Sequence, residues 1–243
     1  MSSIGRSDLL VPGGDAPGDL PVPLEIRPLR TARRMRLRYD EVRGVLKLTC
    51  PAAMSRRRAV AWALDQRGWI DAQLQRAEQP RPFVPGATVP LCGEDVRLVW
   101  SADAPRTPQR HGAELRCGGP ESGFERRIGT YLKTLALEIM AADVADYASR
   151  AGVRPSVVSV GDAASRWGSC SSDRRIRLSW RLILAPVAVR RYVAAHEVAH
   201  LVHLDHSPAF KRLEATLFGT GIAQAKSELR RVGPRLRLFG RGR

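Results

Sequence analysis

The sequence predicts an α+β protein, in which a strand-rich N-terminal part precedes a mainly helical domain. Before residue 101, short stretches alternate apolar and polar side chains with the period of two that is typical of half-buried strands. After residue 122, apolar residues recur at three- and four-residue intervals, as on one face of an amphipathic helix. With 243 residues, 44% of them apolar, the chain is long enough to bury a core and to form one or two domains.

The N-terminal part begins with a segment that is poor in large apolar side chains. Residues 1–23 contain four prolines and four glycines, so we expect a disordered leader there. Residues 24–101 then form the strand-rich part. Residues 34–39 alternate basic and apolar side chains, and residues 45–49 return as the partner strand. Ser55 is a suitable N-cap for the one helix expected in this part.

The remaining chain divides into a connection, a domain and a tail. Residues 102–122 are polar and rich in proline and glycine, which indicates a linker or long loop. Residues 123–229 form the C-terminal domain, whose first element is one long amphipathic helix from Phe124 to Val144. Residues 230–243 include six arginines, and we expect a fraying basic tail.

Composition and termini exclude several classes of protein. The longest apolar run, at 182–189, is interrupted by Pro186 and is too short to cross a membrane. The N-terminus lacks the pattern of a signal peptide, so we expect a cytoplasmic protein. The four cysteines form no CxxC pair, which favours reduced thiols over a disulfide or cysteine–zinc framework; they are Cys50, Cys92, Cys117 and Cys170.

The charge balance suggests a class of partner. The chain has 40 Lys and Arg against 24 Asp and Glu, a net charge of +16, and such a field attracts polyanions. Non-specific binding of nucleic acid is therefore one hypothesis. The excess is spread over the whole chain, so an arginine-rich composition without any such partner is the alternative.

The segment with the strongest chemical signal is His196-Glu197-Val198-Ala199-His200. Residues four apart lie on one face of a helix, one turn from each other, so both imidazoles can reach a single zinc ion. Glu197 can act as the general base on a water in an open position of the metal. A surface helix with two histidines by chance is the alternative. The apolar residues before the motif argue against it, because a buried helix rarely carries such groups without a partner.

A catalytic zinc usually has a third protein ligand, for which the sequence offers three candidates. His206 follows His200 by six residues, so it can reach the ion only if the chain leaves the helix and turns back. The start of a new helix at Ser207 favours such a break. Glu214 on that next helix remains an alternative, as does His203, which lies on the same helix face as His196 and His200. A straight helix, however, would carry His203 about 10 Å from His196.

Four blocks of the sequence, in this order, resemble the YgjP-type and SprT-like zinc metallopeptidases. They are Arg166-Trp167-Gly168-Ser169-Cys170-Ser171, residues 176–182, His196-Glu197-x-x-His200-Leu201 and Asp205-His206-Ser207-x-x-Phe210. The resemblance extends weakly upstream and covers roughly residues 24–218. It implies a zincin-like catalytic domain over residues 123–229, a zinc cofactor, peptide or protein substrates, and His206 as the third ligand. Asp205 departs from the family pattern, where asparagine is common at that position.

The segment Arg166-Trp167-Gly168 suggests substrate contacts. Gly168 permits close backbone approach, Trp167 offers a flat apolar surface, and Arg166 is a candidate to stabilise a developing oxyanion. A core role for Trp167 and a structural ion pair for Arg166 are the alternatives. The predicted function is thus a zinc metallopeptidase. A nucleic-acid-associated SprT-like protease and a non-enzymatic, zinc-stabilised binding module are the two other classes, and an intact Glu197 argues against the second.

Overall fold

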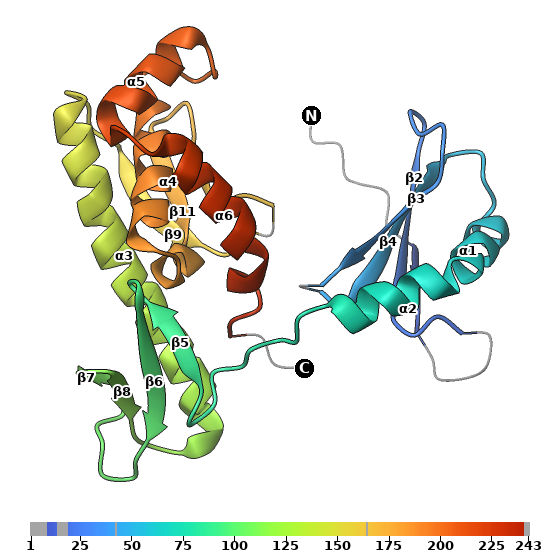
Figure 1. The fold of residues 1–243 in the computed structure, drawn as a ribbon, viewed down its shortest axis with the longest axis horizontal. Helices are drawn as coiled ribbons and strands as arrows, with labels where there is room; N and C mark the ends of the chain where they lie inside the picture. Colours follow the sequence, from blue (N-terminus) through green and yellow to red (C-terminus); the bar gives the residue numbers. More distant parts are fainter. Residues whose placement is uncertain (1–8, 14–18, 42, 164, 241–243) are drawn as a thin grey trace. The chain divides into compact units, whose positions relative to one another are not determined.

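The computed structural model describes residues 9–13, 19–41, 43–163 and 165–240. It confirms the α+β class, with sheets and helices in both parts of the chain (Figure 1). The chain divides into two compact units, Met1–Gln79 and Pro80–Arg243. No helix of the described residues is long and apolar enough to cross a membrane.

The N-terminal unit is a four-stranded sheet with two helices packed on one face (Figure 1). In spatial order its strands are β1 (Leu9–Val11), β2 (Leu24–Leu29), β4 (Val45–Pro51) and β3 (Arg36–Asp40). The helices are α1 (Arg56–Asp65), capped by the Ser55 hydroxyl as predicted, and α2 (Arg67–Arg76). Alternate residues of the strands, among them Ile26 and Leu48, are fully buried under the helices, so the opposite face carries the polar residues.

The C-terminal unit contains two sheets. The first, in spatial order, consists of β5 (Thr88–Leu91), β6 (Glu94–Trp100), β8 (Glu114–Cys117) and β7 (Gln109–His111). The second consists of β10 (Gly168–Cys170), β11 (Arg175–Ser179) and β9 (Val157–Gly161). In this second sheet β11 pairs antiparallel with β10 and parallel with β9, which leaves β10 at an edge.

The described residues of this unit also form four helices: α3 (Phe124–Arg150), α4 (Val187–Ala199), α5 (Pro208–Phe218) and α6 (Ile222–Leu236). Two short 3-10 turns, η1 (Glu121–Gly123) and η2 (Trp180–Leu184), precede α3 and α4. Helix α4 lies in the middle and contacts α3, α5, α6 and the strands β10 and β11 (Figure 1). One hydrophobic core joins both sheets and all four helices, so α4 is held on several sides.

The structure corrects the domain boundaries expected from the sequence. The predicted part 24–101 does not form one body, because the strands β5 and β6 belong to the C-terminal unit. Their apolar residues, such as Leu91 and Leu98, are buried in the same core as Ile128 of α3. The predicted linker 102–122 instead contains β7 and β8, which extend that sheet. The single helix expected after Ser55 is broken into α1 and α2 at Gln66.

The described residues of both predicted end segments contain regular structure that the sequence did not predict. Within the predicted leader 1–23, β1 pairs antiparallel with β2, and Leu20 is buried; residues 1–8 and 14–18 lie outside the described part. The predicted basic tail 230–243 begins inside α6 and continues to the buried Leu238 and Phe239. The physical reason is amphipathicity: apolar residues of α6 enter the core while its arginines stay near solvent.

Candidate active site

Three histidines converge at the C-terminal end of α4. His196 lies in the last turn of the helix, and His200 is its C-cap residue. The chain then turns, and His206 comes back so that its Nε2 lies 3.4 Å from Nε2 of His196. One nitrogen of each of the three rings lies within 4.8 Å of the others. This spacing is small enough for all three nitrogens to bind one metal ion, since zinc–imidazole bonds are about 2.0–2.1 Å long.

The break that returns His206 has a local cause. The hydroxyl of Ser207 accepts a hydrogen bond from the backbone N–H of Phe210, and Pro208 occupies the first turn of α5. The Asp205 carboxylate accepts a hydrogen bond from the backbone N–H of Ser207. Asp205 therefore helps to start α5. Together these residues fix a new helix start directly behind His206.

The hydrogen bonds of the first two histidines fit a metal site. Nδ1 of His196 lies 2.7 Å from Oε1 of Glu214, and Nδ1 of His200 lies 2.9 Å from the backbone oxygen of His203. Burial lowers the pKa of His196, so the neutral ring donates its Nδ1–H to the carboxylate. Both rings then keep the lone pair of Nε2 for a metal. The residues present therefore fit a zinc ion with three imidazole ligands.

The two alternative ligands considered from sequence take other positions. Glu214 engages Nδ1 of His196, the nitrogen away from His206, and the side chain of His203 is not part of the three-histidine group found among the described residues. Glu214 is only 3% exposed and also accepts hydrogen bonds from Tyr192 and Lys226. Burial acts to raise its pKa, but the hydrogen bonds from His196, Tyr192 and Lys226 outweigh burial and lower it. An ionised Glu214 thus orients the His196 ring.

Two residues that contact Glu214, Tyr192 and Lys226, are not among the site residues predicted from the sequence. Tyr192 precedes His196 by four residues, so helical spacing places it on the same face and was a usable signal. Lys226 lies on α6, and nothing in the sequence near it points to Glu214, which lies on α5. Its contact with Glu214 depends on how two helices pack.

Glu197, the residue that follows His196 on α4, has a buried side chain. Its exposed fraction is 5%, and burial raises the pKa of its carboxyl to about 7, while the nearby charge of Arg166 acts to lower it. A carboxyl with a pKa near neutrality is suited to accept and return a proton. Arg166 itself is exposed, and it makes no ion pair with a carboxylate of the described residues within salt-bridge distance.

Gly168 at the start of β10 touches the Glu197 side chain. A Cβ atom at Gly168 would overlap Oε1 of Glu197 and lie 2.7 Å from its Cδ and Cγ. The close approach expected from the sequence therefore has a partner, which is the carboxyl group of Glu197. A glycine here allows β10 and α4 to pack with that carboxyl between them.

We expect Gly168→Ala to lower any hydrolytic activity by between about 10- and 100-fold, because the added methyl group displaces the Glu197 carboxyl. Metal content should stay near that of the wild type, since the three atoms nearest to the added methyl group belong to Glu197 and not to a histidine. The matched control is Gly129→Ala in α3, where a Cβ atom would meet nothing within 4 Å. Equal activity of the Gly168 and Gly129 variants would show that the contact with Glu197 has no functional role.

Trp167 packs away from the histidines, against α6. Its ring is half-buried, adjoins the main core, lies against Gly233 and has the guanidinium of Arg237 4.3 Å from the ring centroid. The backbone oxygen of Trp167 accepts a hydrogen bond from the N–H of Ser179, which continues the pairing of β10 with β11. These contacts favour the structural alternative, in which Trp167 anchors the start of β10.

The site is of the metallopeptidase class, because an acid–base carboxyl accompanies three nitrogen donors spaced for one metal ion. Comparison with known families agrees: a model described as YgjP-like, metallopeptidase domain, matches residues 33–232. The chain belongs to the YgjP-like metallopeptidase family. No curated protein matches the sequence.

Two solved structures are similar to part of the chain. One is the metallopeptidase zymogen jannalysin of Methanocaldococcus jannaschii, with 13% sequence identity and a TM-score of 0.35 over 38% of this chain and 94% of that one. The other is the metallopeptidase zymogen abylysin of Pyrococcus abyssi, with 20% identity and a TM-score of 0.35 over 40% of this chain and 95% of that one. The family assignment rests on the family model alone.

Proposed function

We propose that this protein is a zinc-dependent peptidase, in which His196, His200 and His206 hold the metal and Glu197 moves the proton. The observation that carries the proposal is the convergence of three imidazole nitrogens within 4.8 Å. The donor set supports zinc, because three neutral imidazoles with an open fourth position are typical of catalytic zinc. Glu214 and the backbone oxygen of His203 support it further by orienting two of the rings.

Bound at these nitrogens, zinc would lower the pKa of a coordinated water towards ~7 and polarise the scissile carbonyl. Glu197 accepts the proton of the attacking water, for which its raised pKa is suited. The same carboxyl then returns that proton to the leaving amine nitrogen. Gly168 packs against the Glu197 carboxyl, and the charge of Arg166 favours the ionised form of Glu197 before the attack.

The edge strand β10 offers a place for the peptide. It pairs with β11 on one side and has no other strand partner among the described residues. An extended substrate can add to such an edge through main-chain hydrogen bonds, which give affinity with little dependence on sequence. Since Gly168 of β10 touches Glu197, a peptide on this edge lies beside the proposed base.

The test is metal removal and restoration. We expect a chelator to abolish hydrolysis of an unstructured protein substrate, and about one equivalent of zinc per chain to restore it. Protein purified without a metal-binding tag should contain that zinc. If the chelated protein stays fully active, the metal does no chemistry. If zinc raises the melting temperature but no substrate is cleaved, the non-enzymatic binding module is the correct class.

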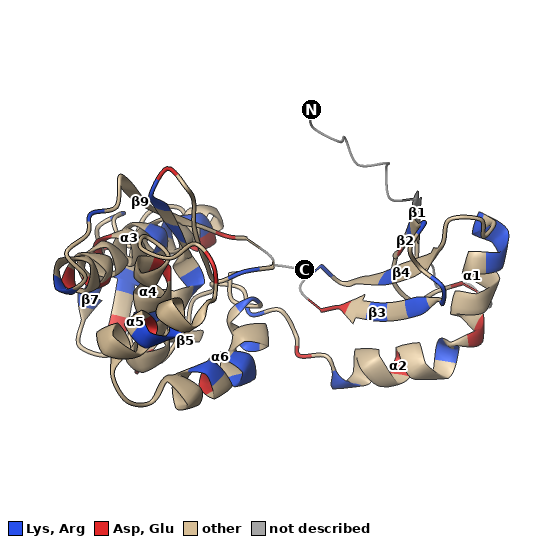
Figure 2. Cartoon of the chain, turned by 90° about the horizontal axis from the view of Figure 1, so that it is seen from above, with Lys and Arg blue, Asp and Glu red and all other residues tan. Residues whose placement is uncertain are grey.

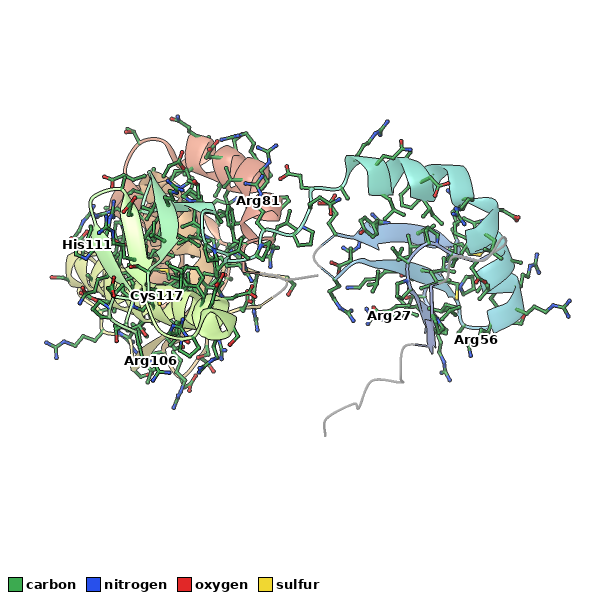
Figure 3. The ribbon with its side chains drawn as sticks, turned by 90° about the horizontal axis from the view of Figure 1, so that it is seen from below. Arg27, Arg56, Arg81, Arg106, His111 and Cys117 are labelled. Atoms are coloured by element: carbon green, nitrogen blue, oxygen red, sulfur yellow. The ribbon has the colours of Figure 1, made fainter. Side chains whose placement is uncertain are left out.

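A second candidate partner is nucleic acid, which one feature of the N-terminal unit favours. The face of its sheet that is free of helices carries a cavity of about 380 Å³; the basic residues around it are Arg27, Arg36, Arg38, Arg43 and Lys47. Figure 2 shows Lys and Arg along the strands of this sheet, and Figure 3 shows the side chain of Arg27 on it. Arg43 pairs with Glu25, and Lys47 pairs with Asp40. The three other arginines form no ion pair with a described carboxylate, so they leave uncompensated charge for phosphates.

We expect this face to bind duplex DNA without sequence preference. With about four phosphate contacts, affinity should fall by ~10²-fold between ~50 and ~200 mM salt, because the contacts release counterions. The double variant Arg36→Gln/Arg38→Gln should weaken binding and flatten the salt dependence. Arg57→Gln/Arg58→Gln on α1 removes the same charge elsewhere and is the control. Equal losses in both variants would show that only net charge matters.

A further inference from the structure

A second cavity adjoins β10, the strand whose Gly168 contacts the Glu197 carboxyl. Its volume is about 280 Å³, near the lower end of the range for ligand sites. Its walls come from β10, β11, the end of β9 and the residues between β9 and β10. Gly168 lines this cavity and also touches the Glu197 carboxyl, so one residue connects the cavity with the proposed catalytic group.

The charge of the cavity is positive. Arg166 and Arg177 line it, and neither forms an ion pair with a carboxylate of the described residues. Asp162, the acidic residue of the lining, is held by the buried Arg181, with Nε to Oδ1 at 2.8 Å and Nη2 to Oδ2 at 3.1 Å. Its charge is therefore balanced by a residue outside the cavity. Among the described residues, the guanidinium groups of Arg166 and Arg177 are thus not held in ion pairs, although the charge of Arg166 acts on Glu197.

The cavity also contains an unsatisfied buried hydroxyl group. Ser179 lines it, is 4% exposed, and its Oγ has no hydrogen-bond partner among the described residues. Buried polar atoms are nearly always hydrogen-bonded, so such an atom beside a cavity points to a ligand. Gly161 of β9 is the strand partner of Ser179. The guanidinium of Arg177 packs against Gly161, and a Cβ atom added at Gly161 would lie 2.8 Å from Cζ of Arg177.

One wall of this cavity belongs to the edge strand β10, to which a peptide would add. Ser169 of β10 lies directly opposite Arg177 of β11, so both side chains are on the same face of the sheet. Ile176 and Leu178 are buried on the other face. A peptide strand added to the edge of β10 directs alternate side chains to each face. Every second side chain of the peptide is therefore on the face that carries Arg177.

We propose that this cavity is a specificity site for a substrate carboxylate, held by Arg177 together with Arg166 and Ser179. A planar guanidinium binds a carboxylate through two parallel hydrogen bonds, and the Ser179 hydroxyl supplies a further donor. Arg177 is the main determinant, because Arg166 is also close enough to affect Glu197. This inference rests on the proposed peptidase function. The carboxylate comes either from an internal acidic residue or from the C-terminus of the substrate.

The test is a set of matched peptides. One glutamate, glutamine or lysine is placed at successive positions of a neutral peptide, and each peptide is made with a free or an amidated C-terminus. We expect the zinc-loaded wild type to prefer glutamate over glutamine at one position by about tenfold in kcat/KM, the value of one charge-assisted hydrogen bond. A preference for the free C-terminus over the amide, without a preference for glutamate, assigns the C-terminal carboxylate instead.

Variants of β11 make the test specific. Arg177→Gln should bring the ratio of glutamate to glutamine peptides close to one, and Arg177→Glu should favour the lysine peptide. Arg175→Gln is the matched control, because Arg175 lies on the same strand, pairs with Asp173 and does not line the cavity. It should keep the wild-type ratio. A wild type that cleaves peptides without any carboxylate preference, or an unchanged ratio in Arg177→Gln, overturns the inference.

A binding measurement separates this inference from the proposed function. If the zinc-loaded wild type cleaves no peptide, the peptidase proposal fails while the cavity still has a readout. Fluorescence anisotropy of the same labelled peptides with Glu197→Gln protein should show about tenfold tighter binding of the carboxylate peptide than of its amide counterpart. Equal affinities, or an equal difference in Arg177→Gln/Glu197→Gln protein, contradict the specificity site.

Discussion

Glu197→Gln is expected to lower peptide hydrolysis by ~10²-fold or more while zinc content stays that of the wild type. Glutamine keeps the size of the side chain, so the contact with Gly168 is preserved. It cannot accept the proton of the attacking water. Burial already raises the pKa of this carboxyl to about 7, so removal of the charge should not destabilise the fold.

The matched control for Glu197 is Glu228→Gln. Glu228 lies on α6, pairs with Arg231 and takes no part in the site, so this variant makes the same chemical change elsewhere. Hydrolysis is measured with excess zinc, and metal content is measured on the same samples. Full activity of Glu197→Gln would show that another group moves the proton.

His206→Ala is expected to weaken zinc binding by at least ~10²-fold, more than is usual when only a supporting residue is lost. His206 is exposed, so its removal leaves no cavity in the core, and the metal-free protein should unfold at the same denaturant concentration as the wild type. The loss then appears in the affinity for the metal and, at limiting zinc, in the activity.

His203→Ala is the control for His206. It removes an imidazole from the same turn, but the atom of His203 that contacts the site is its backbone oxygen, which alanine retains. Zinc affinity should therefore be unchanged in this variant. If His203→Ala loses zinc and His206→Ala does not, the third ligand is misassigned.

The sequence predicts the parts of the site that depend on local spacing. Four residues separate His196 from His200, and Ser207 with Pro208 marks a helix start, so the turn that returns His206 follows from neighbouring residues alone. The role of Glu214 does not. Glu214 contacts His196 because α5 packs against α4, and sequence spacing alone left it as an alternative ligand.

The predicted boundary of the N-terminal part, at residue 101, differs from the observed boundary at Gln79 for a related reason. The strand patterns of residues 24–101 were recognised, but alternation does not reveal which core a strand joins. Leu98 lies in the C-terminal core and Leu48 in the N-terminal one, although both occur in similar alternating segments. Likewise, the arginines of residues 230–243 suggested a tail, although Leu236 and Phe239 in this segment are buried in the core.

The measurement that tests the central claim most directly is the crystal structure of the zinc-loaded protein, with the metal located by its anomalous scattering. We expect one zinc ion bound by nitrogens of His196, His200 and His206, each about 2.0–2.1 Å away. Glu214 should remain hydrogen-bonded to Nδ1 of His196. A zinc ion bound by an oxygen of Glu214 with His206 facing solvent, or no zinc between these histidines, would contradict the proposed metal site.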